Sequence, residues 1–178
     1  MNFFPQSSFE IPRQQNGLIA ADKHSRAEFW NLVDAATDPD ISGGIGCYIF
    51  SIRAGRGALP WYVGMAEKQS FRDECFTSHK INHYNNAIVG RKGTPLLTLV
   101  SKYTPGNKIV SPNGSEHRDI QFLETMLISS ALRRNPELSN KQDTKFLRDM
   151  IVHGLINTPK GKAFGSVNEF RQLIGIGE

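Results

Sequence analysis

The sequence predicts an α+β fold in which a small three-stranded antiparallel sheet is flanked by helices. Two observations lead to this prediction. Segments with the composition of strands alternate with segments of helical periodicity in the order β-β-α-β-α. The chain has 178 residues, of which 39% are hydrophobic and 21% are charged, as is typical of one globular domain with a core of its own.

Three segments are predicted to form the sheet. Residues 46–52 are rich in aromatic and β-branched side chains, and the apolar residues 61–64 follow after the turn-forming stretch 54–57. We therefore expect these two strands to pair as a hairpin. The apolar run at residues 95–103 supplies the third strand.

Helices are predicted before, between and after these strands. Apolar residues recur at helical spacing over residues 27–36. The capping-box pattern of Ser70 with Asp73 predicts the start of a helix that runs through His79 towards Asn86. Further helices are expected at residues 116–134, 144–155 and 167–174.

The predicted organisation has three parts. Residues 1–43 form an N-terminal arm and helix, and about the first twenty of them are expected to be irregular because they mix Pro, Gln, Ser and Asn without periodicity. Residues 44–142 form the core. Residues 143–178 form a C-terminal helical extension that is expected to pack on it.

Composition and charge limit the classes of function. No apolar run approaches the length of about 20 residues that spans a bilayer, and the first residues lack the pattern of a signal peptide. The two cysteines, Cys47 and Cys75, favour free thiols in a cytoplasmic protein over a secreted disulfide framework. Residues 41–142 hold thirteen Lys/Arg against seven Asp/Glu. This bias favours a polyanionic partner, although solvated surfaces often carry a similar excess.

Glu124 is the most informative single residue. At 100° per residue it falls within the apolar stripe of the predicted helix 116–134, whose other members are Ile120, Leu123, Leu127, Ile128 and Ala131. Burying an unpaired carboxylate is strongly unfavourable. The side chain must therefore be neutralised, pair with a cation in the core, or open into a polar cleft where it binds a metal.

A second group of candidate residues lies on the helix that is predicted to run from Ser70 towards Asn86. In one continuous helix, Arg72, His79 and His83 share a face. Arginine supplies planar donors that match phosphate oxygens and stays charged at any working pH. Each histidine also has a simpler interpretation, as a solvated or capping side chain.

Two other sites are disfavoured by the sequence. A zinc site formed by Cys47, Cys75, His79 and His83 lacks the paired ligand motifs typical of such sites. The glycine-rich residues 43–46 precede a strand instead of opening a helix, which excludes a dinucleotide-binding loop.

Together these segments resemble the GIY-YIG nuclease domain over about residues 44–142. Residues 46–48, Gly-Cys-Tyr, resemble the first signature, and residues 62–64, Tyr-Val-Gly, resemble the second. Arg72 lies ten residues after Tyr62, in the place of the family's helical arginine. Residues 123–128 resemble the metal-binding helix, and residues 136–140 resemble the closing segment with its asparagine.

The resemblance implies a role for each matched residue. Tyr48 would activate the attacking water with Tyr62 assisting, and Arg72 would neutralise the scissile phosphate. Glu124 would hold one divalent metal ion, Mg²⁺ or Mn²⁺. Water molecules and a phosphate oxygen would complete the coordination shell of this ion. Asn140 would brace the site by hydrogen bonding. Without the resemblance, tyrosines on strands are more often core residues.

The chain departs from the family pattern at three places. Cys47 replaces the usual isoleucine, and the stretch at residues 104–115 is long. Phe76 stands where several members carry a histidine, and His79 is expected to take part of that role from further along the helix. The residues expected to contact nucleic acid are Arg72, His79, Lys80 and His83.

The sequence therefore predicts a metal-dependent endonuclease that hydrolyses nucleic-acid phosphodiester bonds, with DNA as the expected substrate and no association with a membrane. Two alternatives remain open at this point. One is a non-catalytic nucleic-acid-binding module that keeps the nuclease fold. The other is a regulatory or partner-binding domain without nucleic acid.

Overall fold

The computed structural model describes residues 1–178 except residues 38–39, 56, 141–143, 157, 162–163 and 177–178. The chain divides into two compact units, Met1–Asn140 and Lys141–Glu178, and each is described by itself. The predicted packing of the C-terminal extension on the core stays a prediction. Within the described residues, no helix is both long and apolar enough to cross a membrane.

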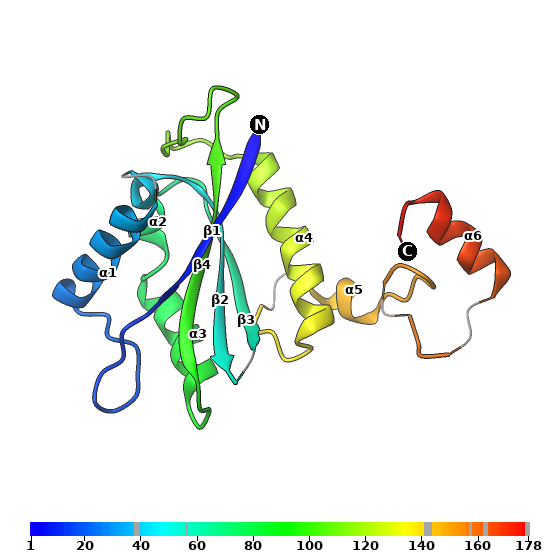
Figure 1. The fold of residues 1–178 in the computed structure, drawn as a ribbon, viewed down its shortest axis with the longest axis horizontal. Coiled ribbons are helices and arrows are strands. Elements are labelled where there is room, and N and C mark those ends of the chain that lie inside the picture. The colour runs from blue at the N-terminus through cyan, green and yellow to red at the C-terminus, as the bar shows by residue number, and fades with distance from the viewer. Residues whose placement is uncertain (38–39, 56, 141–143, 157, 162–163, 177–178) are drawn as a thin grey trace. The chain divides into compact units, whose positions relative to one another are not determined.

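Four strands form one antiparallel sheet in the order β1-β4-β2-β3 (Figure 1). They are β1 (Asn2–Glu10), β2 (Gly46–Ala54), β3 (Gly57–Ala66) and β4 (Thr94–Tyr103). The α+β class and the β2–β3 hairpin are confirmed, with Tyr48 opposite Gly64 in its register. The predicted number of three strands is wrong, because β1 adds a fourth.

β1 forms where an irregular arm was predicted. It lies at the edge of the sheet, and Phe9 is its one buried side chain among the nine residues of the strand. The pairing with β4 shifts register between Pro5 and Ser8. A proline, a bulge and an exposed edge all weaken the period-two pattern by which strands are recognised. The pairing with β4 stabilises the strand instead.

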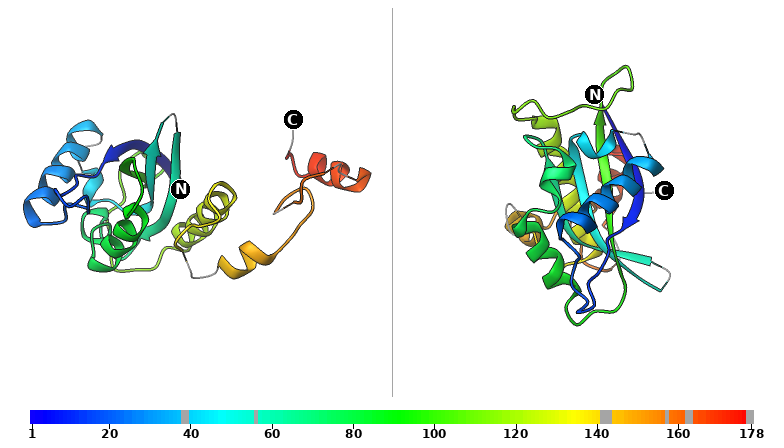
Figure 2. Two further views of the ribbon diagram at one scale, coloured as in Figure 1. Left: turned by 90° about the horizontal axis from the view of Figure 1, so that it is seen from below. Right: turned by 90° about the vertical axis from the view of Figure 1, so that its left-hand side faces the viewer.

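Helices of the first unit cover both faces of the sheet (Figure 2). One face carries α1 (Lys23–Ala36), α2 (Phe71–Glu74) and α3 (Ser78–Ile88), and the other carries α4 (Arg118–Arg134). The larger core cluster lies on the first face and includes Phe29, Trp30, Tyr48, Phe50 and Tyr84. The smaller cluster under α4 includes Ile45, Cys47 and Ile120. Adjacent residues of β2 therefore point to opposite faces, as a strand requires.

The single helix predicted from Ser70 towards Asn86 is wrong, because the structure divides it into α2 and α3. The predicted cap is present, since Ser70 Oγ accepts a hydrogen bond from the Asp73 amide. Phe71 and Phe76, five residues apart, are both buried. In a continuous helix they would point about 140° apart. The break lets both rings enter the core, where Phe76 packs edge-on against Trp30.

Among its described residues, the second unit has two short helices, α5 (Thr144–Asp149) and α6 (Gly165–Leu173). The first is shorter than the predicted helix 144–155. Val152 and Ile156 form an isolated β-bridge, and Gly154 between them has a φ of 87°. This left-handed glycine turns the chain where the helix was expected to continue.

Candidate active site

The two glycines of the sequence signatures have direct structural reasons. A Cβ at Gly64 would lie 2.5 Å from Cζ and Oη of Tyr48, whose ring lies across the paired strand. Gly46 has a φ of 152°, and a Cβ there would lie 2.2 Å from the Val100 carbonyl oxygen. Side chains at either position would displace the β2 backbone or the Tyr48 ring. The absence of a side chain at Gly64 therefore leaves room for the Tyr48 ring, and its absence at Gly46 leaves room for the Val100 carbonyl.

Tyr48 lies inside the core. Its exposed fraction is 0%, and its hydroxyl lies close to that of Tyr84, which is also buried. Burial raises the pKa of Tyr48 well above its usual value, and the neighbouring ionisable groups Tyr84, Cys75, Tyr62 and Glu74 raise it further. Each of these influences opposes the phenolate form. Tyr48 is therefore a neutral phenol in this structure.

Tyr62 has a different environment, although it lies on the strand next to Tyr48. Lys80 Nζ of α3 donates a hydrogen bond to Tyr62 Oη at 2.7 Å. Lys80 also forms an ion pair with Glu74 of α2, at 3.3 Å between Nζ and Oε1. Burial raises the pKa of Tyr62, and the hydrogen bond and the charge of Lys80 offset only part of this increase, so the pKa lies above its usual value. Tyr62 is thus the signature tyrosine that lies beside a cation.

The charge of Lys80 is maintained by the same contacts. Burial lowers the pKa of Lys80, but the bond to Tyr62 and the charges of Tyr62 and Glu74 outweigh it, so the pKa lies above its usual value. The Lys80 and Glu74 side chains are 15% and 23% exposed, so solvent screens this ion pair only in part. The resulting chain of contacts runs from Tyr62 through Lys80 to Glu74.

Two histidines of α3 extend this group. The His83 ring stacks on the Tyr62 ring, with centroids 4.8 Å apart and an interplanar angle of 26°. His79 is exposed, and its Nε2 lies 3.1 Å from Nε2 of His83. The structure therefore brings His79, Lys80 and His83 to one side of α3 near Tyr62.

Glu124 lies on α4, which packs chiefly along the edge strand β3. Its side chain is partly exposed instead of buried. The negative charge of Glu124 contributes to the raised pKa values of Tyr62 and Cys47, behind burial in both cases. Because the carboxylate reaches solvent, its place in the apolar stripe does not require an ion pair in the core. Glu124 is close enough to act electrostatically on Tyr62.

Asn140 holds the free edge of β3. Its side-chain oxygen accepts a hydrogen bond from the Val63 amide at 2.9 Å, and its Nδ2 donates to the Val63 carbonyl at 2.7 Å. Ser139 and Asn135 bond in the same way to the carbonyls of Trp61 and Pro60. The segment after α4 thus occupies the edge of β3 at the residues around Tyr62.

Arg72 points away from this group. Its Nη2 donates to Asp34 Oδ2 at 3.0 Å and to Ser42 Oγ at 2.8 Å, which are contacts with α1 and the short helix η1 (Ile41–Gly43). Glu74, two positions later on the single turn of α2, faces Lys80 instead. The predicted shared face of Arg72, His79 and His83 is wrong, because it required one continuous helix. The Arg72 side chain is 52% exposed and keeps further donors.

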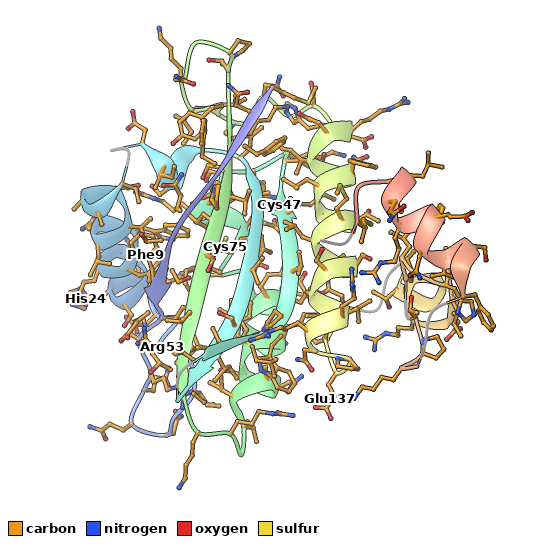
Figure 3. The ribbon with its side chains drawn as sticks, turned by 45° about the vertical axis from the view of Figure 1, so that its right-hand side comes forward. Phe9, His24, Cys47, Arg53, Cys75 and Glu137 are labelled. Carbon is orange, nitrogen blue, oxygen red and sulfur yellow. The ribbon has the colours of Figure 1, made fainter. Side chains whose placement is uncertain are left out.

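The four residues of the possible zinc site, Cys47, Cys75, His79 and His83, do not come together, although the two histidines are neighbours. No group of three or more His, Cys, Asp or Glu side chains in the described part of the chain is placed to hold a metal ion. Cys47 and Cys75, labelled in Figure 3, are both buried and belong to the two separate core clusters. A site that depends on Glu124 would therefore offer one protein carboxylate. This fits a hard cation such as Mg²⁺, which keeps several waters and binds substrate phosphates.

Sequence reasoning missed Glu74 as part of this group and expected Lys80 to contact nucleic acid. Glu74 and Lys80 are six residues apart, a spacing that does not place them together on one helix. They meet because the chain breaks between α2 and α3, which the periodicity did not indicate. In comparisons with known proteins, no family model, curated protein or solved structure matches this chain.

Proposed function

We propose that the chain is a metal-dependent endonuclease of the GIY-YIG type that hydrolyses phosphodiester bonds in DNA. The single observation that carries the proposal is the contact chain of Tyr62, Lys80 and Glu74, with Glu124 acting electrostatically on Tyr62. A phenol beside an ammonium group and a carboxylate is suited to proton transfer and charge stabilisation at a phosphate. The two signatures on paired strands also support it.

Tyr62 carries the proton transfer in this proposal. Its oxygen accepts the hydrogen bond from Lys80, so its own hydrogen is directed to another partner, either the attacking water or a phosphate oxygen. To act as a base, Tyr62 first releases its phenolic proton to bulk solvent, and the Lys80 ammonium stabilises the phenolate that remains. The phenolate then accepts a proton from the attacking water as the water oxygen bonds to phosphorus and the bond to the leaving oxygen breaks. Glu74 keeps Lys80 charged during this exchange. Tyr48, which was expected to activate the water, instead packs in the core next to Tyr62.

Arg72 and Glu124 act on the phosphate from other elements. The exposed Arg72 guanidinium keeps donors beyond the Nη2 that binds Asp34 and Ser42, and these neutralise a phosphate oxygen. Glu124 holds the divalent ion, Mg²⁺ or Mn²⁺. When bound, the ion supplies charge stabilisation for the leaving oxygen. Asn140 positions Tyr62 by fixing the backbone of the adjacent Val63.

The test is cleavage of supercoiled and linear plasmid DNA by the purified full chain with Mg²⁺ or Mn²⁺. Glu124→Gln removes the charge that holds the ion, and the cleavage rate is expected to fall by about 10²-fold or more. The matched control is Glu137→Gln, an exposed glutamate shortly after α4 whose partner is Arg91. Figure 3 shows its position. The control is expected to cut as the wild type does.

The outcomes separate the alternatives. Cleavage that is equal in the wild type and in Glu124→Gln would contradict the assigned metal site. Tight DNA binding by the wild type without cleavage would replace the nuclease by a binding module. A wild type that neither binds nor cuts DNA would favour the regulatory alternative.

A further inference from the structure

We infer that His79 and His83 form a binding site for a borderline divalent transition-metal ion such as Zn²⁺, Ni²⁺ or Cu²⁺, distinct from the Mg²⁺ or Mn²⁺ ion proposed at Glu124. The two residues lie four apart on α3, so both rings emerge from the same helix face. Paired histidines at this spacing on a helix are a recognised arrangement for binding zinc. The inference does not rest on the proposed nuclease activity.

The distance between the two nitrogens fits chelation of one ion. Nε2 of His79 and Nε2 of His83 are 3.1 Å apart. With metal–nitrogen bonds of about 2.0–2.1 Å, this separation corresponds to an angle of about 100° at the metal. That angle lies between the ideal values for octahedral and tetrahedral geometry. A shared hydrogen between two neutral rings gives a similar distance, so metal binding is the property that must be measured.

The surroundings determine which ions the pair accepts. Imidazole nitrogen is a borderline ligand that suits Zn²⁺, Ni²⁺ and Cu²⁺, whereas Mg²⁺ prefers oxygen. Since no third His, Cys, Asp or Glu side chain completes a metal-binding group in the described residues, water or phosphate oxygens fill the remaining positions. Affinity is therefore expected to follow the order Cu²⁺ above Ni²⁺ and Zn²⁺, with Mn²⁺ weakest.

One ring of the pair is held in place by the protein. The His83 ring stacks on Tyr62, which itself accepts the Lys80 hydrogen bond. His79 is exposed and open to solvent. The site thus consists of one positioned ligand and one accessible ligand. A bound ion would lie on the side of α3 that faces Tyr62.

The experiment is calorimetric titration of the untagged full chain with Ni²⁺, Zn²⁺ and Mn²⁺, with Mg²⁺ in excess to occupy oxygen sites. One ion per chain is expected to bind the wild type. His79→Gln and His83→Gln are each expected to weaken binding by about tenfold or more, as the loss of one of two ligands implies. The matched control is His24→Gln, another exposed helical histidine, whose i+4 neighbour is Glu28. It is expected to bind as the wild type does.

A second measurement distinguishes the loss of metal binding from a folding defect in the variants. Zn²⁺ is expected to raise the melting temperature of the wild type and of His24→Gln, because the ion binds the folded helix. The increase should be absent in His79→Gln, whose side chain is exposed. Binding that is unchanged in both α3 variants, or equal for Mn²⁺ and Ni²⁺, would overturn the inference. Either result leaves the proposed cleavage reaction untouched, because no DNA is present.

Discussion

Tyr48 and Tyr62 lie on paired strands with ring centroids 6.3 Å apart, yet their surroundings differ in kind. Around Tyr48 the neighbours are aromatic rings, a buried thiol and Gly64, and no cation contributes to its pKa. Around Tyr62 the neighbours include Lys80 and His83. Both side chains belong to the same core cluster, and they differ in that the Tyr62 hydroxyl accepts a hydrogen bond from Lys80.

This difference shows that a signature tyrosine does not define its own chemistry. A phenol has a pKa near 10, so at neutral pH it acts as a base only where a neighbouring cation stabilises its anion. In the described residues, the structure gives Tyr62 that cation and gives Tyr48 none. Within the proposed function, the comparison therefore favours Tyr62 over Tyr48 for the proton transfer.

Loss of each hydroxyl is the most direct way to break the comparison. Tyr62→Phe is expected to lower the DNA cleavage rate by about 10²–10⁴-fold, the range for loss of a general acid or base. Tyr48→Phe is expected to lower it by less than about tenfold, because its hydroxyl contacts no charged group. Single-turnover cleavage rates on one plasmid measure both. The reverse order of effects would restore Tyr48 as the residue that activates water.

Lys80→Met extends this prediction. Removing the ammonium raises the pKa of Tyr62, since the Lys80 hydrogen bond and charge now lower it. The alkaline rise of the cleavage rate should therefore move to higher pH. A pH profile identical to that of the wild type would show that Lys80 has only a packing role.

The sequence predicted much of the fold because three of the four strands have buried apolar faces. β2, β3 and β4 carry apolar or aromatic residues on faces that are buried, so composition alone indicates them. β1 could not be recognised, because its Pro5 and its exposed side chains resemble a loop and its pairing with β4 is a long-range contact. The burial of Phe76 similarly overrode the local helical pattern after α2.

For the candidate site, the sequence predicted which elements carry the residues better than it predicted their contacts. Tyr48, Tyr62 and Glu124 are found on the expected elements. The environments of the two tyrosines depend on where α2 ends and α3 begins, and this break follows from packing in the core. The contact between Arg72 and Asp34 joins residues 38 positions apart, a distance over which periodicity carries no information.

Gly64→Ala tests the packing of the Tyr48 ring against β3. The added Cβ would lie 2.5 Å from the Tyr48 ring, which is fully buried and has no space to move. The free energy of unfolding is expected to fall by about 1–3 kcal/mol, as is typical of overpacking. Urea denaturation followed by tryptophan fluorescence measures it. Gly43→Ala is the control, since nothing lies within 4 Å of its Cβ.

Equal stability of Gly64→Ala and the wild type would contradict the packing of Tyr48 against β3. If the stability falls as expected, the cleavage rate of the folded fraction decides a further point. Tyr62 lies two residues from Gly64 on the same face of β3, with its ring centroid 6.3 Å from that of Tyr48, so this rate shows whether displacement of the Tyr48 ring also displaces Tyr62.

Asn140→Ala tests the hydrogen bonds at the edge of β3 next to Tyr62. It removes the two hydrogen bonds to Val63, the residue after Tyr62, and leaves the edge of β3 to solvent. The free energy of unfolding is expected to fall by about 1–2 kcal/mol. The control is Asn113→Ala, in which an exposed side chain loses one bond to the Ser115 amide. Urea denaturation of both variants gives the difference, and an equal loss in the control would show that the edge contact carries no special stability.

Alkaline unfolding gives the smallest expected effect and separates the two tyrosines by stability alone. Because the folded pKa of Tyr48 is raised, its neutral phenol stabilises the fold fully below the unfolded value of 10.0, and this contribution is lost as pH rises above it. From pH 10 to 11 the loss is about 1 kcal/mol for one such tyrosine. Tyr48→Phe removes this loss. At neutral pH its stability in urea is expected to be close to that of the wild type, because the one neighbouring polar group of the buried hydroxyl it removes is the hydroxyl of Tyr84 among the described residues. Urea titrations at pH 8, 10 and 11 test this. A variant whose stability falls with pH as steeply as that of the wild type would show that Tyr48 ionises in the folded protein, and Tyr48 would then regain the role assigned here to Tyr62.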